Sequence, residues 1–142
     1  LGNDMNYMVN QSRYAGFQQG CQTLGLKSSD VLFRHGLGTA LDCSHAVDEL
    51  LEKGVSRFIA MDEEVCLNIL MHLRERGISI PEQVQVGSLY DSKQLSLWSE
   101  SIPALSFDAA ELGRVTCREL LHFLRDEEFN PNPTLGYRIL MR

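Results

Sequence analysis

The sequence predicts an α/β fold in which a mainly parallel sheet is flanked by helices. Short apolar runs alternate along the chain with longer segments whose apolar residues recur at helical spacing. A helix between successive strands is the pattern of βαβ units, and these build parallel sheets. The chain holds 142 residues, which suits about one domain.

Five apolar runs are expected to form the strands. They are bounded by Gly, Pro, Asp or Asn, which end regular structure. We expect Val31, Phe58 to Met61 and 84–89 to lie in interior strands. The five predicted strands are 31–33, 57–61, 84–89, 104–107 and 135–141.

Four helices are predicted between these strands. Asn10 is expected to cap the first one and Gly25 to end it. Asp62 is expected to cap the third helix, whose first turn carries Glu63 and Glu64, and Asp108 with Glu111 forms a start similar to a capping box. The predicted helices are 10–24, 44–53, 62–77 and 108–124.

The charge balance excludes some functions for these residues. Thirteen Lys and Arg stand against 19 Asp and Glu, a net charge of -6. Such a surface repels phosphate backbones, so we do not expect these residues to hold nucleic acid themselves. No apolar run approaches the roughly 18 residues that span a bilayer, so no membrane partner is expected. Leu1 and Gly2 are typical of the end of a strand, so we expect the chain to be part of a longer protein.

The four cysteines predict a reducing compartment, and hence the cytoplasm. They are scattered without a C-x-x-C pair. Cys21, Cys66 and Cys117 fall inside apolar helical patterns, where a free cysteine acts as a small hydrophobic residue. Cys43 is the fourth.

No catalytic, metal or cofactor site is predicted. The four histidines lie on separate segments without metal-ligand spacing. The sequence contains no P-loop, no G-x-S-x-G and no G-x-G-x-x-G. An enzyme of the flavodoxin-like or Rossmann type would need a phosphate loop or an acid–base pair at the strand ends. The residues therefore favour a protein that binds a small molecule without transforming it.

Ligands of open parallel sheets bind beyond the carboxyl ends of the strands, which here means 3–9, 35–42, 61–62 and 90–91. Arg13 lies nearby, in the first turn of its helix, where a cation opposes the helix dipole. Either its side chain is solvated there, or its guanidinium reaches across the cleft to an acceptor. Asp62 is explained as a helix cap, and Asp91 is suited either to the cleft or to a turn.

Several motifs resemble those of the LacI/GalR transcriptional repressors. The segment 12–17, SRYAGF, resembles the R-x-x-G-F segment of that family. The run from FIAMD at 58–62 to IPEQV at 80–84 is similar to F-x-x-N-D followed by G-x-x-V-P-x-D-V. PALS at 103–106 and ELG at 111–113 look like P-x-L-T followed by E-L-G. The resemblance covers nearly the whole chain in the same order and spacing.

This resemblance implies a fold like that of type I periplasmic binding proteins, built as two lobes joined by crossing strands. Residues 1–104 would form most of the C-terminal lobe. Residues 105–128 would carry a crossover helix that packs on the N-terminal lobe, and 129–142 would return as a strand. The resemblance also implies a DNA-binding head and most of the N-terminal lobe upstream, a homodimer, and a small-molecule effector, commonly a sugar or a purine.

The resemblance further implies an effector site. Arg13 matches the family's arginine that hydrogen-bonds the effector, and Tyr7 to Val9 match a loop that lines the pocket. The family's effector-binding aspartate falls at Tyr90 by strict spacing, or at Asp91 with a shift of one residue. Met61 replaces the family's asparagine, and no aromatic residue stands at 38 or 39, where the family places a stacking ring.

Two further functions stay open at this stage. A periplasmic sugar-binding protein of a transporter shares the fold, and its upstream sequence would carry a signal peptide instead of a DNA-binding head. A domain that has lost its effector and serves only to dimerise is the other, and Met61 favours it.

Overall fold

The computed structural model describes residues 1–98 and 102–141. Its sheet has the order β1-β2-β3-β4. β1 runs parallel to β2, β2 runs parallel to β3, and β4 runs antiparallel to β3, so the predicted mainly parallel sheet is confirmed. The elements, in chain order, are α1 (Met8–Thr23), a 3₁₀ turn (Ser28–Asp30), α2 (Ala40–Glu52), β1 (Arg57–Ala60), α3 (Glu63–Glu75), β2 (Gln85–Ser88), α4 (Lys93–Trp98), β3 (Ala104–Phe107), α5 (Ala109–Leu124) and β4 (Tyr137–Leu140).

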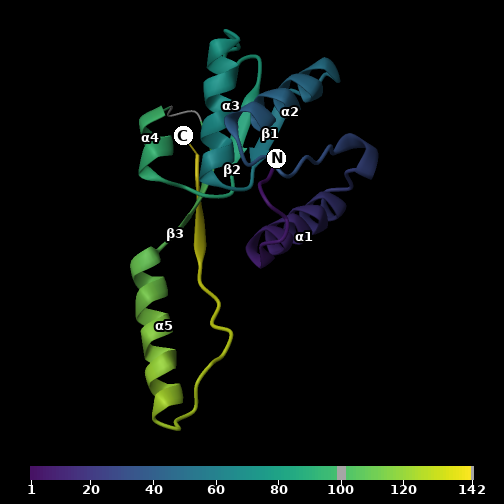
Figure 1. Ribbon diagram of the computed structural model, residues 1–142. Helices are drawn as coiled ribbons and strands as arrows, with labels where there is room; N and C mark the ends of the chain where they lie inside the picture. Colours follow the sequence, from purple (N-terminus) through teal and green to yellow (C-terminus); the bar gives the residue numbers. More distant parts are fainter. Residues whose placement is uncertain (99–101, 142) are drawn as a thin grey trace.

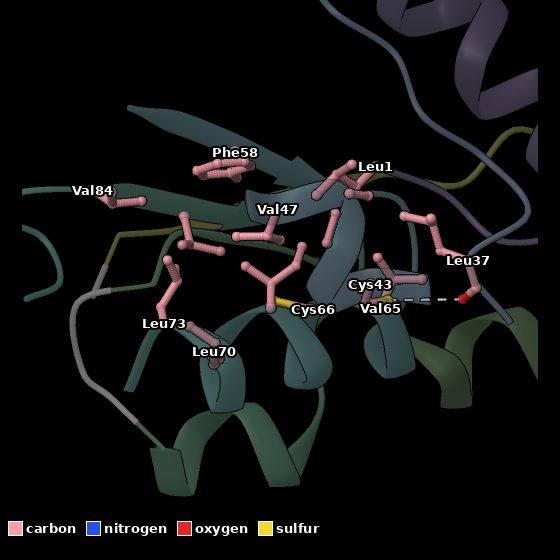
Figure 2. Close-up of a cluster of buried hydrophobic side chains, with 14 of the residues drawn as sticks. Leu1, Leu37, Cys43, Val47, Phe58, Val65, Cys66, Leu70, Leu73 and Val84 are labelled. Atoms are coloured by element: carbon pink, nitrogen blue, oxygen red, sulfur yellow. Dashed lines mark hydrogen bonds between the residues drawn. The ribbon is translucent and has the colours of Figure 1, made fainter. Parts of the chain in front are cut away.

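The core lies between α2, α3 and one face of the sheet (Figures 1 and 2). Phe58 of β1 and Val86 of β2 belong to one buried cluster with Val47 of α2 and Leu73 of α3, and all four are almost fully buried. Alternation along β1 turns Ile59 to the opposite face, where it is exposed. This sheet therefore buries one face much more fully than the other.

The predicted caps of the third and fourth helices are confirmed. Oδ1 of Asp62 accepts the backbone N–H of Val65 at 2.9 Å. Oδ1 of Asp108 accepts the backbone N–H of Glu111 at 2.9 Å. Each carboxylate satisfies a donor that the first turn of a helix leaves unpaired. The first turn of α3 starts at the carboxyl end of β1, and this fixes its acidic residues at that edge of the sheet.

Two helices start earlier than predicted. α1 begins at Met8, so Asn10 lies inside the helix and does not cap it. Its buried amide instead donates to the carbonyl of Asp4 at 2.8 Å, which pins the preceding loop. α2 begins at Ala40, because Thr39 and Asp42 form a capping box that ends the loop before Ser44.

The predicted strand at 31–33 is wrong, because this segment forms no strand. The ring of Phe33 stacks on Tyr14 of α1, with 4.0 Å between the ring centroids. Backbone pairing with the start of the chain begins just after this segment. Gly2 donates to the carbonyl of Arg34 at 2.9 Å, and Gly36 donates to the carbonyl of Asn3 at 3.1 Å. Phe33 thus packs on α1, and the segment that carries it stays outside the four-stranded sheet.

The structure adds one helix that was not predicted and corrects one further expectation. The stretch leading to Trp98 forms the helix α4, and the Trp98 ring covers the guanidinium of Arg74, 5.6 Å from the ring centroid. Cys117 is exposed on α5 and is not a core residue, whereas Cys66 is fully buried. Apolar spacing predicted the correct face of α3, but the apolar face of α5 is not covered.

Figure 1 shows α5 lying apart from the layer of α2 and α3, with β3 and β4 extending toward it. Within α5, only Val115 is buried. Its apolar side chains are at least two-fifths exposed at Leu112, Leu120, Leu121, Phe123 and Leu124. An amphipathic helix gains most of its stability from packing its apolar face, and α5 presents that face uncovered.

Candidate effector site

An open hollow of about 450 Å³ lies where the carboxyl ends of the strands meet the start of α1. It is built from four separate parts of the chain: the loop before α1, the first half of α1, the start of α3 and the residues after β2. The side chains that line it are Asn3, Tyr7, Asn10, Arg13, Asp62, Glu63, Glu64 and Tyr90. The sequence predicted a ligand site at this edge of the sheet, and eight polar or aromatic side chains from four parts of the chain line a hollow there.

Arg13 enters the hollow from the second turn of α1. Its Nη1 donates to Oδ1 of Asn10 at 3.4 Å, and the side chain is half-buried. Asn10 is itself held by its bond to the Asp4 carbonyl. This hydrogen bond orients one edge of the guanidinium group. Its other N–H groups remain available to an acceptor in the hollow.

Tyr7 and Tyr90 bring two aromatic rings to the same hollow. Tyr7 is 64% exposed and Tyr90 is 40% exposed. The Tyr90 backbone is fixed, because its N–H donates to Oγ of Ser88 at 3.1 Å and its carbonyl accepts the Ser88 hydroxyl at 2.7 Å. The loop after β2 therefore presents Tyr90 to the hollow in a set position.

Asp91 and Met61 are not among the residues that line this hollow. The Asp91 backbone N–H donates to the carbonyl of Leu105 at 2.7 Å, which ties the residue to β3. Met61 is 3% exposed and packs against Gly2, where an added Cβ would lie 2.7 Å from its sulfur. Of the two positions that matched the family's aspartate, Tyr90 is the one that reaches the hollow.

Met61 contributes to a second, apolar hollow of about 510 Å³ between α1 and the free face of β1. Phe17 and Cys21 line it from α1, and Ile59 lines it from β1. Methionine is a flexible hydrophobic residue that fills irregular gaps, and that role accounts for it here.

Three lining residues were not predicted as part of the site: Asn10, Glu63 and Glu64, whereas Asn3 falls in the predicted stretch 3–9. The sequence assigned Asn10 and the two glutamates to helix capping and to the helix dipole, which fully explained them. Their position beside the strand ends was the signal that they also border the cleft. Asp62 borders it too; its Oδ1 caps α3, and its Oδ2 is buried without a hydrogen-bond partner.

Within the described residues, no group of three or more His, Cys, Asp or Glu side chains is placed to hold a metal ion. The hollow is instead suited to an organic ligand, because it combines a cation, carboxylates, amides and aromatic rings. Such a composition is suited to orienting a small polar molecule, and among the residues that line the hollow no nucleophile lies beside a base.

A family model described as a periplasmic binding protein-like domain matches residues 2–142. The chain belongs to this family. The match also confirms the fold class that the motifs implied.

Curated relatives are transcriptional regulators. The chain is 25% identical to the HTH-type transcriptional regulator AscG of Escherichia coli, with 100% of this chain and 43% of that protein covered. It is 27% identical to catabolite control protein A of Staphylococcus aureus, over 80% of this chain and 38% of that protein. The periplasmic-binding-protein-like domain described here thus spans less than half the length of these relatives.

Solved structures give the same fold. A Lac repressor structure matches 99% of this chain and 44% of its own, with a TM-score of 0.84 at 15% identity. The regulator CcpA of Lactococcus lactis matches 99% of this chain and 54% of its own, with a TM-score of 0.81 at 18% identity. The resemblance to LacI-type regulators is confirmed, and the transporter alternative is not favoured. No helix in the described part of the domain is long and apolar enough to cross a membrane.

Proposed function

We propose that this chain is the effector-sensing lobe of a LacI-type transcriptional regulator. A small molecule, a sugar or a related metabolite, binds in the hollow, and its binding changes the affinity of the whole protein for operator DNA. The observation that carries this proposal is the meeting of Arg13, Tyr7 and Tyr90 in one hollow at the strand ends. An effector shifts DNA binding by preferring one lobe arrangement over another.

In this proposal the chain contributes to both lobes of the effector-binding domain. Residues 1–104 form most of the C-terminal lobe, 105–128 cross over to pack on an N-terminal lobe, and 129–142 return. The uncovered apolar face of α5 supports this division, since a partner lobe would bury it. Operator DNA is bound by a head outside this chain, because the acidic surface here repels phosphate. The regulator acts in the cytoplasm and catalyses no reaction.

A homodimer is the assembly we propose. Exposed apolar side chains gather where α3 meets α4, with Met71 at 48% and Leu97 at 87% exposure. Leu67 and Trp98 border the same surface. A second copy that packs there would remove this area from water. Introducing a charge with Leu97→Glu is expected to shift the full-length protein toward monomer in sedimentation experiments.

The function is tested by replacing Arg13 in the full-length protein. Arg13→Ala should weaken effector binding by about 1.5–3 kcal/mol, the range for a hydrogen bond to a charged group, with little change in thermal stability. The measurements are thermal melts with hexoses, amino sugars and purines, and operator binding with each of them. Arg125→Ala, an exposed arginine at the end of α5, is the matched control.

Two results would contradict this function. One is an unchanged affinity in Arg13→Ala for a compound that alters operator binding. The other is a loss of the folded state in Arg13→Ala, which would make the residue structural. If no compound of the panel alters operator binding, the domain serves only for dimerisation.

A further inference from the structure

We propose that the effector of this lobe carries a protonated amine together with hydroxyl groups, as an amino sugar does. The inference rests on the proposed function and names the ligand class of the same hollow. It follows from the presence of Asp62, Glu63 and Glu64 in one hollow with Tyr7 and Tyr90, with one arginine among them.

The charge of the lining favours a cation. Three carboxylates and one guanidinium line the hollow. Within the described residues, neither Glu63 nor Glu64 makes an ion pair. Several other glutamates of the chain do have a basic side chain within 4.0 Å. A phosphate or carboxylate ligand at the start of α3 would meet these charges at close range. An ammonium group would be attracted by them instead.

The acidic first turn offsets the dipole of α3, and this alone would explain two solvated glutamates. It does not explain the buried Oδ2 of Asp62, which has no donor in the described structure. A carboxylate oxygen without a hydrogen bond raises the free energy of the folded state. A cation bound nearby would lower the electrostatic part of that free energy.

The aromatic residues point to the same chemistry. Tyr7 and Tyr90 both expose ring surface to the hollow. The face of an aromatic ring carries partial negative charge and attracts organic cations, which is why ammonium ligands are often held between rings and carboxylates. The two rings are thus compatible with an ammonium group as well as with the apolar face of a sugar ring, and the carboxylates supply the preference for the cation.

Arg13 supplies the second half of the recognition. Its guanidinium donates to Asn10, and its other N–H groups have no acceptor within the described residues. A hydroxyl or ring oxygen of the ligand accepts from these groups. A molecule with an amine at one end and hydroxyl groups at the other matches both the acidic and the basic side of the hollow.

The test is isothermal titration of the full-length protein with four probes: glucosamine, glucose, N-acetylglucosamine and glucose 6-phosphate. Glucosamine is expected to bind about tenfold more tightly than glucose, and its affinity should fall as salt is raised, because exposed charges are screened. N-acetylglucosamine keeps the shape but lacks the charge, so it should bind no better than glucose. Glucose 6-phosphate should bind most weakly.

Glu63→Gln and Glu64→Gln should each weaken glucosamine binding about three- to fivefold, the range for a surface ion pair, and leave glucose binding unchanged. The control is Glu75→Gln at the far end of α3. Equal or tighter binding of glucose or glucose 6-phosphate, with an Arg13 dependence, would overturn the charge inference and leave the proposed function standing. Absence of binding by all four probes would count against both.

Discussion

Nε2 of His72 lies 2.8 Å from Oδ1 of Asp48, so a side chain of α3 is tied to the neighbouring helix α2. Nη1 of Arg76, the residue that follows the last residue of α3, donates to the same oxygen at 2.8 Å. The hydrogen bond from His72 is the main reason that the pKa of Asp48 lies below its ordinary value. These contacts hold together the two helices that cover the core.

The first prediction concerns Asp48. A carboxyl whose pKa is depressed in the folded state stabilises the fold above its unfolded pKa, and this stabilisation is lost as the pH falls. Asp48→Asn should therefore lower the free energy of unfolding at pH 7 by roughly 0.2–1 kcal/mol, as for exposed ion pairs, and reduce the difference between pH 7 and pH 3. Urea denaturation at several pH values measures this. Glu52→Gln on the same helix is the control, and an equal effect there would contradict the role of the pair.

The second prediction concerns Glu49, which receives hydrogen bonds from Arg34 and Lys53. The bond from Arg34 is the largest cause that lowers the pKa of Glu49 to about 2. Its contribution is present above an unfolded pKa near 4.5 and is lost as the pH falls toward about 2. Glu49→Gln should flatten the stability profile between these values, and the partner variant Arg34→Gln should do the same. A profile unchanged in both variants would exclude this pair as a source of acid sensitivity.

The third prediction concerns the cysteines. Burial raises the pKa of the Cys66 thiol to about 12, and burial also raises that of Cys43. A thiol reacts as its thiolate, so neither should be alkylated in the folded protein at pH 8. Cys117 is exposed and should react first with iodoacetamide. Mass spectrometry of timed samples follows each site, and early labelling of Cys66 would show that the core opens.

The fourth prediction concerns the core. Leu73 is fully buried between α3 and the sheet. Leu73→Ala should lower the free energy of unfolding by about 2–5 kcal/mol, because it removes apolar contacts and leaves a cavity. Leu41→Ala, at a position on α2 that is 63% exposed, should change it by less than about 0.5 kcal/mol. Similar losses for both would mean that α2 and α3 do not cover the sheet as described.

Sequence reasoning succeeded where one local signal acted alone. Asp62 and Asp108 were identified as caps because a carboxylate ahead of a helical pattern has one dominant role. It failed where a tertiary contact competed with a local preference. The apolar run at 31–33 has a strand-like composition, but the stacking of Phe33 on Tyr14 decides its conformation, and this contact joins residues far apart in the sequence.

The sequence predicted where the candidate site lies better than it predicted which residues line it. Tyr7, Arg13 and Tyr90 line the hollow as the resemblance implied, because strand ends and the helices that follow them converge at one edge of the sheet. Met61 directly follows β1, but its side chain packs on Gly2 and lines the apolar hollow beside α1 instead of the polar one. Which way a residue at a strand end points depends on the neighbouring segment, and a single sequence does not encode that directly.

The pairing of β3 with β4 restricts how α5 can move. Four Cα pairs, from Ala104 with Leu140 to Phe107 with Tyr137, make these strands a two-stranded ribbon that leads from the sheet toward α5. A ribbon of two strands tolerates a large range of twist. Sliding one strand along the other by one residue would instead turn every side chain to the opposite face. We therefore expect α5 to move mainly by rotation about the axis of this ribbon. A protein surface that packs on α5 would then transmit its motion to the sheet as a twist of β3 and β4.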